Sequence, residues 1–202
     1  MAHTFLKHNI SKLYIISVSP EVIAAAKKEI ASDLGDEVAS RIVWKQCDLT
    51  DWTRVHKTAE EIRADAERLD ILVNNAGRGV MTAQMTDYGV DRHMALNHMG
   101  HMVLTSGLLP LLKKTADGGD VVRVTHQSSN AHQNAPSGTK FESLAEINED
   151  VGPNGQYGRS KLASILYTRY FARKNAHPNV LMNATHPGFV STKQSVSDVF
   201  EP

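Results

Sequence analysis

Short apolar runs alternate along the chain with longer stretches in which apolar residues recur at helical spacing. The runs are rich in Ile, Val and Leu, as buried strands are, and they cover residues 13–18, 41–46, 70–74, 120–124 and 180–184. The helical patterns cover residues 20–34, 51–69, 88–114 and 157–175. Strands separated by single helices predict right-handed crossovers, a parallel sheet and a doubly wound α/β fold. Neither an internal repeat nor a low-complexity linker interrupts this pattern, so we expect residues 1–202 to form one domain.

Turn and cap residues mark several of the element boundaries. Ser19 and Pro20 predict the start of the first long helix, and Gly35 can adopt the left-handed conformation that ends it. Thr50 is expected to cap the next helix. Residues 131–154 are polar and contain Pro and Gly, so most of this stretch is predicted to be a loop.

Charge and cysteine content narrow the partners and the compartment. The 22 basic and 22 acidic residues cancel, whereas nucleic acids and anionic membranes attract proteins with a concentrated positive face. We therefore expect neither partner, and no segment approaches the roughly 18 apolar residues of a membrane-spanning helix. Cys47 is the only cysteine, which predicts a reducing compartment, and we expect the cytoplasm. It follows an apolar run, so a buried, inert thiol is a better expectation than a reactive one.

Tyr157 and Lys161 stand four residues apart in the segment YGRSK, within a predicted helix. This spacing places both side chains on one helix face. A phenol has a reference pKa of about 10, and a neighbouring ammonium group favours the phenolate and lowers that pKa. Such a pair could exchange a proton with an alcohol or a carbonyl oxygen. The spacing alone is a weak signal, since a tyrosine beside a solvated lysine gives the same pattern.

A second segment strengthens this interpretation. Residues 74–77, with the sequence NNAG, follow directly on the predicted strand DILV. In open parallel sheets, ligands bind beyond the carboxyl ends of the strands, where this segment would lie. Asn and Gly also favour ordinary turns, but DILVNNAG followed downstream by YGRSK is far less common by chance.

The order of five segments resembles the short-chain dehydrogenase/reductase family. They are ILVNNAG, LNHMGH, QSSNAH, YGRSK and PGFVST, and the resemblance covers residues 5–193. NHMGH, SSNAH and the long separation of Ser129 from Tyr157 are similar to the retinol-dehydrogenase-like branch. The segment FLKHNISKLYIISVSPE is similar to filamentous-fungal members, many of which act in secondary metabolism. The resemblance implies a Rossmann-type sheet and an NAD(P)-dependent oxidoreductase that interconverts an alcohol and a carbonyl on a small, fairly apolar metabolite.

The resemblance also implies a role for each matching residue. Tyr157 would be the acid/base, Lys161 would lower its pKa and hold the nicotinamide ribose, and Asn97 would anchor a water relay to Lys161. Ser129, rather than its neighbour Ser128, would hydrogen-bond the substrate oxygen. The remaining cofactor-binding residues would be Asp48 at the adenine, Asn75, Ala76 and Gly77 at the adenine ribose, and Val190 and Thr192 at the nicotinamide carboxamide. Blander readings are a solvent-facing Asn97, a Ser129 that only caps a loop, and an Asp48 that only ends a strand.

The sequence departs from the family at both ends. Family members open with a strand, a TGxxxGxG loop and a helix, whereas residues 3–9 resemble only the end of that helix. The glycine-rich loop normally brings backbone N–H groups to the cofactor pyrophosphate. Its strand is central in the family order 3-2-1-4-5-6-7, and the family's last strand is also missing after PGFVST. We therefore expect an incomplete domain, truncated at both ends.

Ten histidines raise the question of a metal site. His93, His98 and His101 cluster on one segment, but the sequence contains no HExxH pattern and no suitably spaced carboxylate or cysteine. We expect no metal, and we expect His98 to be a packed polar residue.

Two functions of different classes follow. The first is an active oxidoreductase with a small-molecule substrate and NADP, or alternatively NAD, as cofactor. The family branch favours NADP, although Val18 stands where an arginine could pair with the 2′-phosphate. The second is a catalytically inactive relative, or a binding or regulatory subunit whose gap another chain fills. By analogy with the family, the helices that carry Asn97 and Tyr157 would form a homodimer.

Overall fold

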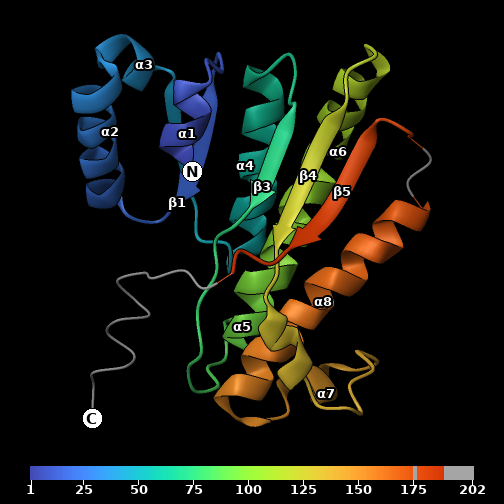
Figure 1. The fold of residues 1–202 in the computed structure, drawn as a ribbon. Helices are drawn as coiled ribbons and strands as arrows, with labels where there is room; N and C mark the ends of the chain where they lie inside the picture. The colour runs from blue at the N-terminus through green and yellow to red at the C-terminus, as the bar shows by residue number, and fades with distance from the viewer. Residues whose placement is uncertain (175–176, 189–202) are drawn as a thin grey trace.

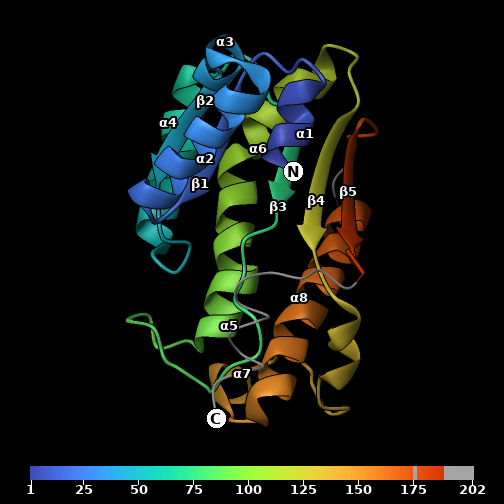
Figure 2. The same cartoon turned by 60° about the vertical axis from the view of Figure 1, so that its left-hand side comes forward.

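The strands form two parallel sheets in a computed structural model that describes residues 1–174 and 177–188. β1 (Leu13–Ser17) pairs with β2 (Ile42–Gln46) in the first sheet. The second sheet has the order β3-β4-β5, with β3 (Ile71–Asn74), β4 (Val122–Gln127) and β5 (Val180–Thr185). Helices pack on both sides of the strands (Figures 1 and 2), which confirms the doubly wound α/β fold.

The helices connect the strands in the predicted alternation. They are α1 (Ala2–Lys7), α2 (Pro20–Leu34), α3 (Asp36–Ser40), α4 (Trp52–Asp65), α5 (Arg92–Met94), α6 (His101–Asp117), α7 (Leu144–Asn148) and α8 (Gly152–Lys174). A π-helix, η1 (Ala95–Gly100), joins α5 to α6, and a 3-10 helix, η2 (Asn130–Asn134), follows β4. No helix within residues 1–174 or 177–188 combines the length and apolar character needed to cross a bilayer.

The ends of the first two long helices test the predicted caps. The Ser19 hydroxyl accepts a hydrogen bond from the Val22 N–H, and Gly35 has φ 92°, so both predicted ends of α2 are confirmed. The prediction for α4 was wrong: the side chain of Asp51, not Thr50, accepts the N–H of Arg54 at 2.9 Å. The negative charge of a carboxylate at this position is also attracted by the positive end of the helix dipole, whereas a threonine hydroxyl is neutral.

Several boundaries extend beyond the predicted ones. β4 continues to Gln127 because β3 and β5 flank it on both edges, with register pairs Asn74–His126 and Gln127–Thr185. The polar residues at this end of the strand hid it from the apolar pattern. Residues 131–154, predicted to be mostly loop, contain η2, α7 and the first residues of α8.

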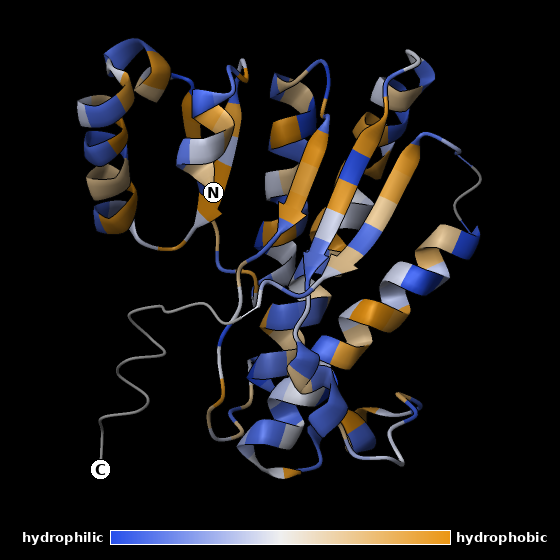
Figure 3. Ribbon diagram, in the orientation of Figure 1, coloured by the Kyte–Doolittle hydropathy of each residue, from blue (hydrophilic) through white to orange (hydrophobic). Residues whose placement is uncertain are grey.

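Alternate residues of β1 face two different helix layers. Leu13 and Ile15 pack in a cluster with Leu6 of α1 and Ile30 of α2. Tyr14 and Ile16 pack on the main core, to which α4 and α6 contribute. Figure 3 shows β3 coloured mainly as hydrophobic, whereas the segment around α7 and the start of α8 is mostly polar. The burial of β1 on both faces is typical of a parallel strand that helices cover on both sides.

A slot separates the two sheets. β1 and β3 line a cavity of about 1080 Å³ together with residues of α1, α4 and α6. Within the described parts of the chain no strand lies between β1 and β3, so each presents a backbone edge without a ladder partner to the slot. The slot lies where the sequence analysis expected the central strand of the family's sheet to be absent.

Candidate active site

The predicted acid/base pair lies at the carboxyl ends of β3 and β4. Lys161 Nζ donates a hydrogen bond to the carbonyl of Gln127, the last residue of β4, at 2.9 Å. The same nitrogen lies 5.4 Å from the centre of the Tyr157 ring. A Cβ atom on Gly77, in the segment after β3, would lie 3.6 Å from Lys161 Nζ and 3.0 Å from Asn97 Oδ1. The structure thus brings Gly77, Asn97, Tyr157 and Lys161 together.

Burial favours the neutral form of Lys161. Its side chain is 4% exposed, and this desolvation lowers its pKa from 10.5 to about 8. An ammonium group has three N–H donors, and the bond to Gln127 uses one. Two donors remain for groups entering from the sheet edge.

Tyr157 is half-buried, and its environment differs from the predicted one. From the sequence we expected the Lys161 ammonium to lower the pKa of Tyr157. In the structure burial raises the pKa of the phenol, and the Ser129 hydroxyl partly opposes this change. Lys161 lies over the ring rather than beside the hydroxyl, which explains why it does not dominate the pKa of Tyr157. The acid/base role itself stays a prediction.

The two adjacent serines after β4 have different surroundings. Ser128 is 4% exposed and donates to the carbonyl of Lys161 at 2.9 Å, so it anchors α8. Ser129 caps η2, accepting from Ala131 N at 3.1 Å, and remains partly exposed near Tyr157. Ser129 is therefore the cap that the simpler interpretation expected, and its role toward a substrate oxygen stays a prediction.

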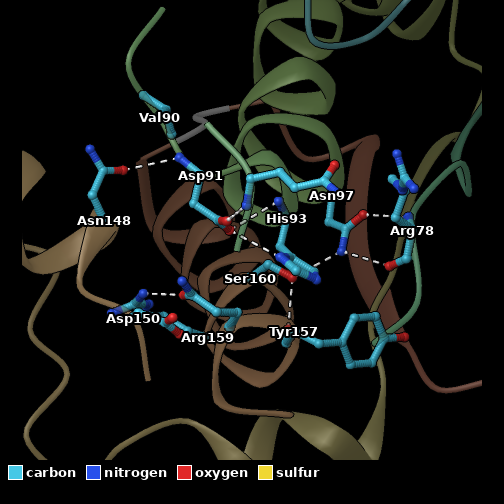
Figure 4. Close-up of polar contacts among 12 residues, drawn as sticks. Arg78, Val90, Asp91, His93, Asn97, Asn148, Asp150, Tyr157, Arg159 and Ser160 are labelled. Carbon is cyan, nitrogen blue, oxygen red and sulfur yellow. Dashed lines mark hydrogen bonds and ion pairs between the residues drawn. The ribbon is translucent and has the colours of Figure 1, made fainter. Parts of the chain in front are cut away.

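Asn97 connects Arg78, the residue after the NNAG segment, to α8. Its Oδ1 accepts from the N–H of Arg78 at 2.8 Å, and its Nδ2 donates to the Arg78 carbonyl and to Ser160 Oγ, at 3.1 and 3.0 Å (Figure 4). At 2% exposure, Asn97 does not face solvent. It lies in η1, and π-helical turns of this kind occur frequently at functional sites.

Of the predicted adenine-side residues, Gly77 lies within this group, whereas Asp48 follows a strand of the other sheet. Asp48 follows β2, and its Oδ1 is already bound by the N–H and hydroxyl of Thr50, both at 2.8 Å. Asn75 and Ala76 line the slot at the carboxyl end of β3, with Gly77 next in the chain. The predicted carboxamide-binding residues Val190 and Thr192 lie outside the described residues.

A buried polar network beneath the NNAG segment was missed. His101 Nε2 lies 2.7 Å from the Ala76 carbonyl and its Nδ1 lies 3.2 Å from Asn74 Oδ1, while the Asn74 amide contacts Thr105 and His126. Burial lowers the pKa of His101 to about 4 and that of His126 to about 3, so both rings are neutral at physiological pH. The available signals were Asn74, the polar last residue of the apolar strand β3, and His126 near the end of β4.

His98, which the sequence placed in the same cluster, has a structural role. His98 packs edge-on against Tyr167, with ring centres 5.8 Å apart, and burial lowers its pKa to about 4. This confirms a packed polar residue. Within residues 1–174 and 177–188, His, Cys, Asp and Glu side chains form no group of three that could hold a metal ion. Cys47 is buried, and burial raises the pKa of its thiol, as expected of an inert cysteine.

Known proteins are similar in sequence to this chain over nearly its whole length. The profile of the family described as short chain dehydrogenase matches residues 1–199. The chain belongs to the short-chain dehydrogenase/reductase family. Its relatives include a Neurospora crassa protein named as the mitochondrial oxidoreductase bli-4, which is 61% identical over 209 residues, covering 100% of this chain and 51% of the relative. Mouse retinol dehydrogenase 14 is 35% identical over 157 residues, covering 78% of this chain and 45% of the relative, so the resemblance to that branch is confirmed.

Solved structures of this family share the fold. The Pseudomonas aeruginosa RhlG/NADP active-site complex aligns with a TM-score of 0.73 and 22% identity, covering 100% of this chain and 71% of that one. NADH-dependent reductase A1-R′ complexed with NAD aligns with a TM-score of 0.71 and 18% identity, covering 98% and 80%. The chain spans about half the length of the curated relatives that it matches most extensively.

Proposed function

We propose that this short-chain dehydrogenase/reductase interconverts an alcohol and a carbonyl on a small, fairly apolar metabolite with a nicotinamide cofactor. The observation that carries the proposal is the convergence of Tyr157, Lys161, Ser129 and Asn97 beside the NNAG segment at one sheet edge. The similarity to filamentous-fungal sequences extends the proposal to a role in secondary metabolism.

The chain's residues divide the work of such a reaction. A bound nicotinamide would supply or accept the hydride. Tyr157 would exchange the proton at the substrate oxygen, and Ser129 would hydrogen-bond that oxygen. Lys161 keeps two N–H donors free for the ribose hydroxyls, while Asn97 fixes the NNAG segment against α8. These residues fit the nicotinamide-ribose end of the cofactor.

The fit is weaker at the phosphate end. In the slot between the two sheets, the described residues form no glycine-rich turn that opens a helix. Such a turn is what would bring backbone N–H groups to the pyrophosphate. Val18, directly after β1, is 56% exposed and offers no charge to a 2′-phosphate. We retain NADP as the proposed cofactor because the family branch favours it, with NAD as the alternative.

Cofactor titration tests this proposal. We expect quenching or enhancement of NADPH fluorescence on adding the protein, with turnover of an apolar ketone, and the same two measurements with NADH rank the cofactors. Absence of both binding and turnover at millimolar NADPH and NADH would refute an active oxidoreductase.

A second function is favoured by the slot between β1 and β3. In this alternative the protein is a binding or regulatory subunit that accepts an extended, apolar segment of another chain as an added strand. Two facing parallel edges and apolar walls are the features used in strand addition. A lysine-flanked poly-valine peptide should bind and should slow amide hydrogen exchange at residues 13–17 and 71–74. The same peptide with a central proline lacks a ladder donor and should not; equal behaviour of the two peptides would exclude strand addition.

The assembly and location are further proposals. Leu166 and Tyr170 are apolar and exposed on α8, which supports a homodimer through this helix. Sedimentation of wild type and Leu166→Glu tests the homodimer, and a wild-type monomer would refute it.

The single cysteine supports a location in the cytoplasm. Recovery of the protein from mitochondria on cell fractionation, in line with the name of the Neurospora relative, would overturn that location.

A further inference from the structure

The first turns of α8, which carry Tyr157, have a sequence that forms helices poorly. Residues 152–158 read GPNGQYG. Gly152, with φ 76°, and Pro153 suit the start of a helix, but Gly155 and Gly158 lie inside it. Each glycine inside a helix costs roughly 1 kcal/mol relative to alanine. Yet α8 begins at Gly152 and runs without a break through Tyr157. Tertiary contacts must therefore hold these turns in place.

One contact lies on the η2 side of the helix. A Cβ atom on Gly158 would lie 2.6 Å from the Ala131 carbonyl and 2.9 Å from Ala135 N. The absence of a side chain thus lets α8 approach the segment that starts at Ser129. Glycine weakens the helix here but permits the close packing of Tyr157 against Ser129.

The other contact is made by Arg159, two residues after Tyr157. Its guanidinium group donates to three backbone carbonyls, those of Glu146, Ile147 and Glu149, at 2.6, 2.8 and 2.8 Å. It also contacts the Gln156 side chain, and it is only 2% exposed. These carbonyls belong to the last turn of α7 and the residue after it, where a helix leaves its carbonyls unpaired. A planar group with five donors can satisfy several of them at once.

No carboxylate of the described residues forms an ion pair with this buried cation. Burial lowers the pKa of Arg159, and Asp91, itself buried, is the charge that opposes this effect most strongly. Asp91 is held nearby because its N–H donates to Asn148 Oδ1 at 3.0 Å, at the end of α7 (Figure 4). The negative end of the α7 dipole adds to the favourable field.

The segment that Arg159 binds, residues 140–149, is itself held together by hydrogen bonds. The Glu146 carboxylate accepts the N–H groups of Lys140, Phe141 and Glu142 at 2.6, 2.9 and 2.9 Å. The Asn148 amide donates to the Gly89 carbonyl at 2.7 Å. Residues 140–149 therefore form a compact support, connected to α8 by Arg159 and to the 89–91 segment by Asn148.

We propose that Arg159 is a positioning residue for Tyr157, which fixes the glycine-rich first turns of α8 by joining them to residues 140–149. The proposal rests on the role of Tyr157 in the proposed function, but its structural part does not. Loss of the guanidinium fork leaves three carbonyls unpaired and releases the turn that holds the phenol. Lysine keeps the charge but has one nitrogen, so it cannot reach the same three carbonyls.

The test compares Arg159→Lys with Arg169→Lys, a matched change at an exposed position of the same helix. In Arg159→Lys we expect amide hydrogen exchange of residues 144–149 and 153–158 to rise by roughly tenfold, with residues 162–171 unchanged. Specific ¹³C labelling of the tyrosine ring, assigned through Tyr157→Phe, then follows titration of the phenol. Water entering the loosened turn should move the Tyr157 pKa back toward its ordinary value. Arg169→Lys should change neither measurement.

The outcomes separate this proposal from the proposed function. Unchanged exchange and titration in Arg159→Lys, or faster exchange spread evenly over the chain, would overturn the positioning role. If wild type binds no cofactor but both local changes occur, the oxidoreductase proposal fails and the positioning role stands. If wild type turns over substrate, Arg159→Lys should lower kcat at least tenfold with little change in the KM of the cofactor, because Lys161 lies beyond the loosened turns.

Discussion

Replacing Lys161 with methionine should make the folded protein more stable at neutral pH while removing the proposed activity. Methionine keeps most of the length and apolar stem of the side chain but carries no charge. Each pKa unit corresponds to about 1.4 kcal/mol, so a fall from 10.5 to about 8 means that burying the ammonium costs the folded state about 3 kcal/mol. The variant also loses the bond to the Gln127 carbonyl, worth about 1–2 kcal/mol. A net gain of about 1–2 kcal/mol remains.

The gain should depend on pH in a defined direction. Between pH 8 and 10.5 the unfolded chain binds more protons at this lysine than the folded one, so wild-type stability rises with pH there. The destabilisation by Lys161 is fully present below pH 8 and disappears as the pH approaches 10.5. The advantage of Lys161→Met should therefore shrink by about 2 kcal/mol between pH 7 and pH 9.5.

Urea unfolding of both proteins at the two pH values measures this change. Lys57→Met, at an exposed position of α4, is the matched control and should show no comparable pH-dependent difference. If Lys161→Met is less stable than wild type at pH 7, or if its advantage is the same at pH 9.5, burial of a charged Lys161 is not a significant cost.

Three further variants test other parts of the structure. Tyr157→Phe should lower turnover at least ~100-fold in a cofactor-absorbance assay with an unchanged circular dichroism spectrum, and retained activity would refute its acid/base role. Gly100→Ala places a Cβ 2.2 Å from the Leu49 carbonyl, so urea unfolding should show a loss of about 1–3 kcal/mol, and wild-type stability would contradict this close approach. Asp51→Ala should cost about 1 kcal/mol in the same assay and more than Thr50→Ala, whereas the reverse order would restore Thr50 as the cap.

The strands were predictable because each contains a short run rich in Val, Ile and Leu, although among the described strands only β1 packs on helices at both faces and β4 and β5 alternate buried with exposed residues. The prediction of β4 ended early because its last residues, among them His126 and Gln127, are polar. The bent start of the 88–114 pattern, with η1 around Asn97, could not be read from periodicity, because a π-helical turn shifts the side-chain spacing locally.

The segment before Tyr157 shows a different limit of sequence reasoning. Pro and Gly correctly indicate weak local preference, but the outcome is decided by contacts with distant residues. Arg159 reaches carbonyls ten to thirteen residues earlier, beyond the window of any helical pattern. The tyrosine–lysine pair was identified correctly as a neighbouring pair, whereas the pKa of Tyr157 was not, because burial depends on packing that the spacing does not describe.

The division into two sheets affects the two ends of the proposed cofactor site differently. Tyr157, Lys161, Asn97 and Ser129 belong to the β3-β4-β5 half, where α6 and α8 pack on the sheet through the main core. Asp48 follows β2 and so belongs to the β1-β2 half. The geometry that tunes Lys161 depends on Gln127 and on burial within its own half, so it does not require that the slot be filled. Alignment of Asp48 with the NNAG segment involves the spacing between β1 and β3, together with the contact of Leu49, the next residue, with Gly100 of η1. Any segment that occupies the slot should therefore act on adenine and phosphate binding far more than on the acid/base pair.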